Sequence, residues 1–122
     1  MKRALVIEDN ADNMKLITFI LEKNGYVTIR AENGKTGIEL TLEEKPDFIL
    51  LDIQLPDMDG LEVLKEIRKS EIDGEIPIIA ITSYAMSGDR ARLIEAGCNG
   101  YLEKPIDPVT VMNQIREIIG DE

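Results

Sequence analysis

Histidine is absent from this chain, and cysteine occurs once, as Cys98. Without histidine there is no histidine acid–base catalyst, no serine–histidine triad and no zinc site with histidine ligands. A single cysteine excludes an internal disulfide framework and a cysteine metal site, and its setting between small residues predicts a buried thiol. The candidate catalytic and ligand-binding groups are therefore carboxylate, hydroxyl and lysine side chains.

Long apolar runs and positive charge are also scarce. No apolar run approaches the length of a membrane span, and Glu8 and Asp9 cut the N-terminal run too short for a signal sequence. Acidic residues outnumber basic ones by 24 to 14, so the net charge of −10 repels nucleic acid phosphates. We therefore expect a cytoplasmic protein with no direct nucleic acid binding and no membrane insertion.

The length of 122 residues suits one domain, here taken as 1–122, and leaves no room for a second folded module. Apolar residues make up 43% and charged residues 31% of the chain, which is typical of a globular protein and not of disorder. The sequence contains no repeat, no low-complexity segment and no linker.

Five short segments have the pattern of β-strands. Residues 4–7, 48–51 and 78–81 are continuous apolar runs, which predicts strands buried on both faces. Residues 27–30 and 100–102 mix apolar with polar side chains, which is typical of edge strands.

Helical patterns occupy the segments between these strands. Asn10 or Asp12 can cap the first helix, which ends before Gly25, and the second spans about 33–44. Asp59 can cap the third, and a fourth spans roughly 87–96. For the last helix we expect Asp107 as the cap and Pro108 as the first helical residue.

Alternating strands and helices predict an α/β fold, a flavodoxin-like (βα)₅ arrangement with a doubly wound parallel five-stranded sheet. In chain order, strands 1, 3 and 4 (residues 4–7, 48–51 and 78–81) are uniformly apolar and belong at the centre of the sheet. Strands 2 and 5 (residues 27–30 and 100–102) belong at its edges. Among the common doubly wound arrangements, strand order 2-1-3-4-5 meets this condition.

Polar residues follow the predicted strands at the edge of the sheet where ligands bind in such folds. They are Glu8 and Asp9 after strand 1, Asp52 after strand 3, Thr82 and Ser83 after strand 4, and Lys104 after strand 5. Taken singly, each has an ordinary reading as a solvated loop charge, a helix-start charge, a turn cap or a surface lysine. Their shared position at the strand ends favours one functional site.

Three carboxylates in one crevice require a compensating cation, and their oxygen ligands suit Mg²⁺. Glu8 and Asp9 would hold the metal directly or through water, and Asp52 would contribute one oxygen. Asp52 is then the candidate nucleophile for phosphoryl transfer. Thr82 and Lys104 are placed to contact phosphoryl oxygens and to stabilise the charge spread over them.

The four strand-end motifs together resemble the receiver domains of bacterial two-component systems, along the whole chain. The carriers are Val6-Ile7-Glu8-Asp9-Asn10, Asp52 through Gly60 (DIQLPDMDG), Ile78 through Ser83 (IIAITS), and Gly100 through Pro105 (GYLEKP). Asn10, Asn13 and Gln54-Leu55-Pro56 are most similar to stand-alone receivers of the DivK type and to receivers attached to hybrid histidine kinases.

This resemblance implies a role for each site residue. Asp52 is implied as the phosphoacceptor, and the backbone carbonyl of Gln54 is implied to complete the Mg²⁺ site with Glu8, Asp9 and Asp52. Thr82 and Tyr101 are implied as the two switch residues. The Lys104–Pro105 peptide bond is expected to be cis, and the varying positions Gln54 and Tyr84 influence how fast the phosphoryl group is lost.

The resemblance also implies partners. These are a histidine kinase or histidine phosphotransferase as donor and a downstream protein, which reads the surface of helix 4, strand 5 and helix 5. The chain itself is expected to be a monomer or weak dimer and not an enzyme beyond self-phosphorylation and slow autodephosphorylation. A receiver cut from a hybrid kinase and a constitutively binding pseudo-receiver are the alternative contexts.

Two other functions are compatible with parts of the pattern. An aspartate-nucleophile phosphatase needs a second acid two residues after Asp52, where this chain has Gln54. A flavodoxin-like electron carrier needs a phosphate loop rich in serine, threonine and glycine after strand 1, where this chain has Glu8-Asp9-Asn10-Ala11-Asp12.

Overall fold

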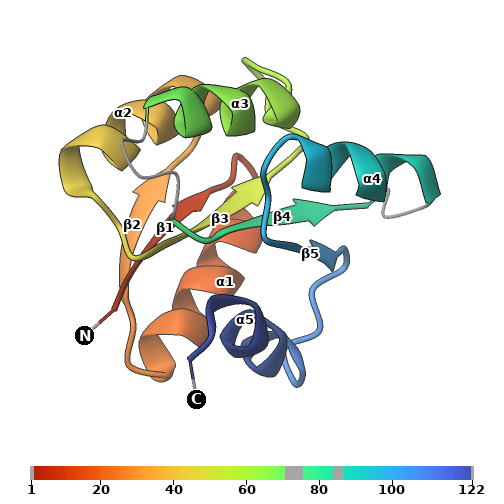
Figure 1. Ribbon diagram of the computed structural model, residues 1–122. Coiled ribbons are helices and arrows are strands. Elements are labelled where there is room, and N and C mark those ends of the chain that lie inside the picture. The colour runs from red at the N-terminus through yellow and green to blue at the C-terminus, as the bar shows by residue number, and fades with distance from the viewer. Residues whose placement is uncertain (1, 71–75, 84–86, 122) are drawn as a thin grey trace.

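The computed structural model describes residues 2–70, 76–83 and 87–121. Within them, strands and helices alternate along the chain (Figure 1): β1 (Arg3–Ile7), α1 (Ala11–Lys23), β2 (Val27–Ala31), α2 (Gly34–Glu44), β3 (Phe48–Asp52), α3 (Gly60–Ser70), β4 (Ile78–Thr82), α4 (Ser87–Glu95), β5 (Gly100–Glu103) and α5 (Val111–Ile119). All neighbouring strands pair in parallel, in the order β2-β1-β3-β4-β5. The predicted fold class, strand order and edge strands are confirmed.

The sheet separates two apolar clusters, because successive side chains of a strand point to opposite faces. One cluster lies under α1 and α5 and includes Val6, Leu50 and Ile81. The other lies under α3 and includes Leu5, Leu51 and the α4 residue Leu93. Figure 1 shows α2 and α3 on one side of the sheet, and α1 and α5 on the other. The three central strands are therefore buried on both faces.

The helix starts confirm two predicted caps and correct a third. The Asn10 side chain accepts the Asn13 N–H, so Asn10 caps α1 rather than Asp12, and Asp59 accepts the Leu61 N–H at the start of α3. The predicted start of the last helix is wrong. Asp107 instead accepts the Val109 N–H, and α5 begins later, at Val111. An aspartate that bonds the backbone two residues on forms a turn that competes with helix.

The position of the cysteine also agrees with expectation. Cys98 is buried, as the sequence predicted, and this burial raises the pKa of its thiol. No helix in the described part of the chain is both long enough and apolar enough to span a membrane.

Tyr26 contacts both Asp121, which follows α5, and Phe48 of the central sheet. Its hydroxyl donates to Asp121 Oδ2, and its ring contacts Phe48 edge-on with 5.6 Å between centroids. We expect Tyr26→Phe to lower the free energy of unfolding by about 1 kcal/mol, since it removes one hydrogen bond and keeps the ring. Urea denaturation measures this loss. Asp121→Ala should then cost less in the Tyr26→Phe background than in the wild type, and strictly additive losses would contradict the contact.

Candidate functional site

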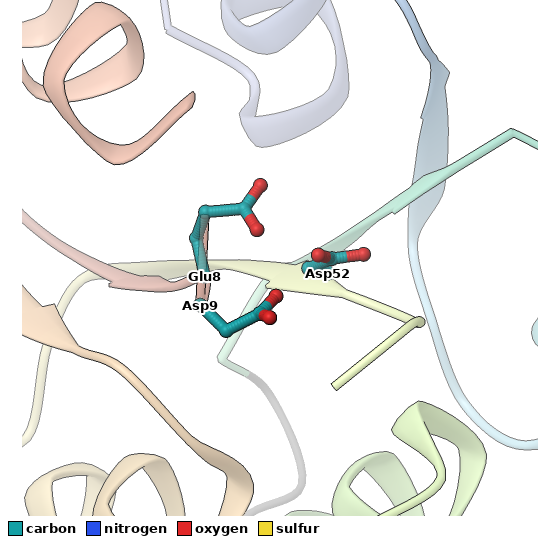
Figure 2. Close-up of side chains that lie close together, drawn as sticks. All are labelled: Glu8, Asp9 and Asp52. Atoms are coloured by element: carbon teal, nitrogen blue, oxygen red, sulfur yellow. The ribbon is translucent and has the colours of Figure 1, made fainter. Parts of the chain in front are cut away.

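Three carboxylates meet at the carboxyl ends of the neighbouring strands β1 and β3. Glu8 and Asp9 directly follow β1, and Asp52 is the last residue of β3. One oxygen from each lies within 4.8 Å of the others, and Figure 2 shows the three carboxyl groups turned toward one another. Parallel pairing of β1 with β3 brings them together across more than forty residues of sequence.

Glu8 and Asp52 are the buried members of the cluster, and each is only 1% exposed. The Oε2 atom of Glu8 accepts the Asn10 N–H at 3.2 Å, whereas its Oε1 is buried without a hydrogen-bond partner in the described part of the chain. Burial, a hydrogen-bond contact with Asp52 and the charge of Asp52 raise the pKa of Glu8 from 4.5 to about 7. The Asn10 N–H and Lys104 oppose this rise only in part.

Asp52 is held by two donors. Lys104 Nζ lies 3.0 Å from Asp52 Oδ1, and the Gln54 backbone N–H donates to the same oxygen at 2.9 Å. The Lys104 side chain is 20% exposed, so the ion pair is largely shielded from water. A buried carboxylate requires such partners because an isolated ionised group in the protein interior is strongly disfavoured.

The remaining predicted site residues lie on β4 and β5 or directly after them. Thr82 is the buried last residue of β4, and its carbonyl accepts the Lys104 N–H at 2.9 Å. The Lys104–Pro105 peptide bond is cis. Tyr101 is half-buried on β5 and packs against the apolar cluster that includes Leu93 of α4. Tyr84 lies outside the described residues.

A cleft of about 320 Å³ gives access to this cluster. It is lined by residues from the ends of β1, β4 and β5 and from α1, namely Glu8, Asn13, Leu16, Ser83, Lys104, Pro105 and Ile106. A larger and more open groove of about 850 Å³ lies along α1 and reaches Arg30 of β2, but none of the three clustered carboxylates lines it. The smaller cleft is therefore the one that leads to the candidate site.

The donor set of the cluster fits Mg²⁺. Its three carboxylates outnumber the positive charge of Lys104. The buried Oε1 of Glu8, which has no hydrogen-bond partner among the described residues, can be satisfied by a cation. Oxygen ligands on opposite sides of Mg²⁺ are about 4 Å apart at its usual ligand distances, close to the spread of these carboxylates. No softer ligand, histidine or cysteine, belongs to the cluster.

Comparison with known proteins decides the family. Residues 4–116 match the family described as the response regulator receiver domain. The chain belongs to this family. It is 42% identical to the polar-differentiation response regulator DivK of Brucella anthropi, over 98% of both chains, and to DivK of Brucella ovis at the same level. It is thus a DivK-like receiver, as the strand-end motifs indicated.

Solved receiver structures agree with this assignment. A receiver domain of a sensor histidine kinase from Pseudomonas aeruginosa superposes with a TM-score of 0.88 at 33% identity, covering 98% of both chains. That receiver has a magnesium ion coordinated in its active-site cleft. A CheY-like receiver from Methanospirillum hungatei gives a TM-score of 0.89 at 30% identity, covering 98% of this chain and 94% of that one.

Family membership also bears on the alternative functions. Receiver domains are signalling domains rather than enzymes in the usual sense, and they bind Mg²⁺ at an acidic site. This disfavours both the aspartate phosphatase and the flavodoxin-like carrier.

The sequence did not reveal every contact around the site. Asp57 accepts hydrogen bonds from the backbone of α2, and the Ser83 hydroxyl lies 3.5 Å from Gln54 Oε1. No local signal marks the first contact, because its partners are more than twenty residues apart in sequence and nearly any loop aspartate has the same local context.

Proposed function

We propose that residues 1–122 form one receiver domain that acts as a phosphorylation-dependent switch in a two-component phosphorelay. Asp52 accepts the phosphoryl group from a phosphohistidine of a histidine kinase or histidine phosphotransferase. The observation that carries this proposal is the pairing of a buried Asp52 with Lys104 at 3.0 Å inside a cluster of three carboxylates. A purely structural ion pair has no need of two further acids beside it.

In the transfer step, a carboxylate oxygen of Asp52 bonds to phosphorus while the phosphorus–nitrogen bond to the donor imidazole breaks. The bonding electrons pass to the imidazole nitrogen. Lys104 exchanges its contact with Asp52 for one with a phosphoryl oxygen, and the Thr82 hydroxyl donates to another. Glu8, Asp9, Asp52 and the Gln54 carbonyl would hold Mg²⁺, which supplies positive charge against the incoming phosphoryl oxygens.

The proposed switch links this site to the surface of α4, β5 and α5. Phosphorylation adds about one and a half to two negative charges. That charge draws Thr82 toward the phosphoryl group and biases the position of Tyr101. Among the described side chains of α4 only Leu93 is buried, while Ile94 is 57% exposed. A helix held by so few apolar contacts is the easiest element to reposition.

The proposed partners follow from this scheme. A kinase or phosphotransferase supplies the phosphoryl group, and a downstream protein reads the α4–β5–α5 surface of a cytoplasmic monomer or weak dimer. Chemistry on the chain itself is limited to self-phosphorylation and slow autodephosphorylation. A receiver within a hybrid histidine kinase is the second candidate context, and the 33% identity to the sensor-kinase receiver of Pseudomonas aeruginosa favours it.

Beryllofluoride, a phosphoryl mimic, tests the proposed switch. With Mg²⁺ present, it should perturb the amide NMR signals of Asp52, Thr82 and Tyr101 in the wild type and leave those of Asp52→Ala unchanged. An unchanged wild-type spectrum, or the same response in Asp52→Ala, would contradict the proposal. Sustained turnover of small phosphate esters would instead identify a phosphatase.

A further inference from the structure

The loop between β3 and α3, residues 53–59, directly follows Asp52 and contains Gln54, whose carbonyl the proposed function assigns to the metal. At its start, the Gln54 N–H bonds Asp52, and at its end the Gly60 N–H donates to the Ile53 carbonyl at 3.0 Å. These contacts fix the two ends of the loop. Asp57 and its neighbours lie between these two ends.

Asp57 supplies a third contact. Its Oδ1 accepts the Gly34 N–H at 2.8 Å, and its Oδ2 accepts the Lys35 N–H at 3.1 Å. Both donors belong to the first turn of α2, where backbone N–H groups have no partner within the helix. These two bonds lower the pKa of Asp57, because they favour its ionised form.

Close packing accompanies these hydrogen bonds. A Cβ placed on Gly34 would lie 3.2 Å from Met58 Cβ and 2.8 Å from Val63 Cγ2. Glycine at this position therefore lets the start of α2 approach the loop and α3. The loop is thus docked on α2 by two charge-assisted hydrogen bonds and by direct contact of Met58, the residue next to Asp57.

We propose that Asp57 is a positioning residue for the metal site: by fastening the 53–59 loop to the N-terminus of α2, it holds the Gln54 carbonyl in place for Mg²⁺. This inference rests on the proposed function, which assigns that carbonyl to the metal. Asp57 itself contacts neither Asp52 nor the other two carboxylates of the cluster.

A second consequence concerns α2. Because Asp57 connects the 53–59 loop to α2, metal binding at the loop and the order of the first turn of α2 should be coupled. Such coupling works in both directions. Mg²⁺ should therefore slow hydrogen exchange of the Gly34 and Lys35 amides, although both lie on a different element from the metal ligands. The Thr36 amide, which bonds the Asn33 side chain at 2.8 Å and not the loop, should change less.

The test compares Mg²⁺ dissociation constants, from NMR titration of the Asp9 and Gln54 amides, in the wild type and three variants. Asp57→Ala removes the fastening. Asp57→Asn keeps one acceptor oxygen but loses the charge and one of the two hydrogen bonds to α2. Asn33→Ala is the matched control, because it removes a cap hydrogen bond from the same turn of α2 without touching the loop.

We expect Asp57→Ala to weaken Mg²⁺ binding by about fivefold or more, the lower end of typical coupling between linked sites. Asp57→Asn should lie between Asp57→Ala and the wild type, and Asn33→Ala should remain within about twofold of the wild type. Unchanged binding in Asp57→Ala or equal weakening in Asn33→Ala would overturn the inference, as would Mg²⁺ slowing exchange of the Gly34 and Lys35 amides in Asp57→Ala as much as in the wild type. Failure of the wild type to bind Mg²⁺ would overturn the proposed function instead.

Discussion

Replacing Glu8 with glutamine should stabilise the metal-free protein at neutral pH and weaken its binding of Mg²⁺. Burial and the adjacent Asp52 raise the pKa of Glu8 from 4.5 to about 7, which means that the folded protein resists ionising this carboxyl. One pKa unit corresponds to about 1.4 kcal/mol, so the rise from 4.5 to about 7 puts the penalty at pH 8 on the order of 3 kcal/mol. Glutamine carries no such penalty, but it offers Mg²⁺ no charge.

The sign and pH range of this effect follow from linkage. The pKa is higher in the folded state, so the associated stability is complete below pH 4.5 and is lost as the pH rises through about 7. The free energy of unfolding of the wild type should therefore fall across this range in chelator. Saturating Mg²⁺ should reverse the fall, because a cation compensates the buried charge and binds only the folded site.

Denaturant unfolding at several pH values, with chelator and with Mg²⁺, measures these effects. Asp9→Asn is the matched control, because Asp9 belongs to the same cluster but is exposed, so its replacement relieves little desolvation. We expect Glu8→Gln to flatten the pH dependence and Asp9→Asn to retain most of it, while both weaken Mg²⁺ binding about tenfold or more. The same pH dependence in Glu8→Gln as in the wild type would show that another group is responsible.

Replacing Gly60 with alanine should cost more stability than the same replacement at Gly100. A Cβ on Gly60 would overlap Ile53 Cα and lie 2.7 Å from the Ile53 carbonyl oxygen, and both are backbone atoms. Backbone atoms cannot rotate away as a side chain can, so the loop after Asp52 must move. Overpacking of this kind costs about 3 kcal/mol or more. The displaced loop carries Gln54, so Mg²⁺ binding should weaken as well.

Gly100→Ala provides the comparison. Its added methyl group would meet only side-chain atoms, at 2.7 Å from Ile118 Cδ1 and 2.8 Å from Ile118 Cγ1, on the far side of the sheet from the loop. We expect a smaller loss of stability, about 1 kcal/mol, and unchanged Mg²⁺ affinity. Thermal unfolding together with Mg²⁺ titration separates the two variants. Equal losses in both, or unimpaired Mg²⁺ binding in Gly60→Ala, would contradict the proposed packing of the loop.

Where the sequence indicated an element correctly, the signal was local and strong. The apolar runs beginning at Ala4, Phe48 and Ile78 are the central strands because only the middle of a parallel sheet buries both faces of a strand. The start of the last helix was predicted wrongly for an equally local reason. Asp107 and Pro108 suit a helix start, but the same aspartate can close a turn, and the structure contains the turn.

The sequence by itself determined the parallel sheet, its strand order and the gathering of Glu8, Asp9, Asp52, Thr82 and Lys104 at one edge, because strand burial and strand direction depend on patterns within short segments. Only the tertiary structure decided that Glu8 is buried with one oxygen that no described residue hydrogen-bonds, and that Lys104 reaches Asp52. It alone showed that Asp57 bonds the start of α2. Burial, pKa and such contacts depend on neighbours brought together from distant segments, which no local pattern specifies.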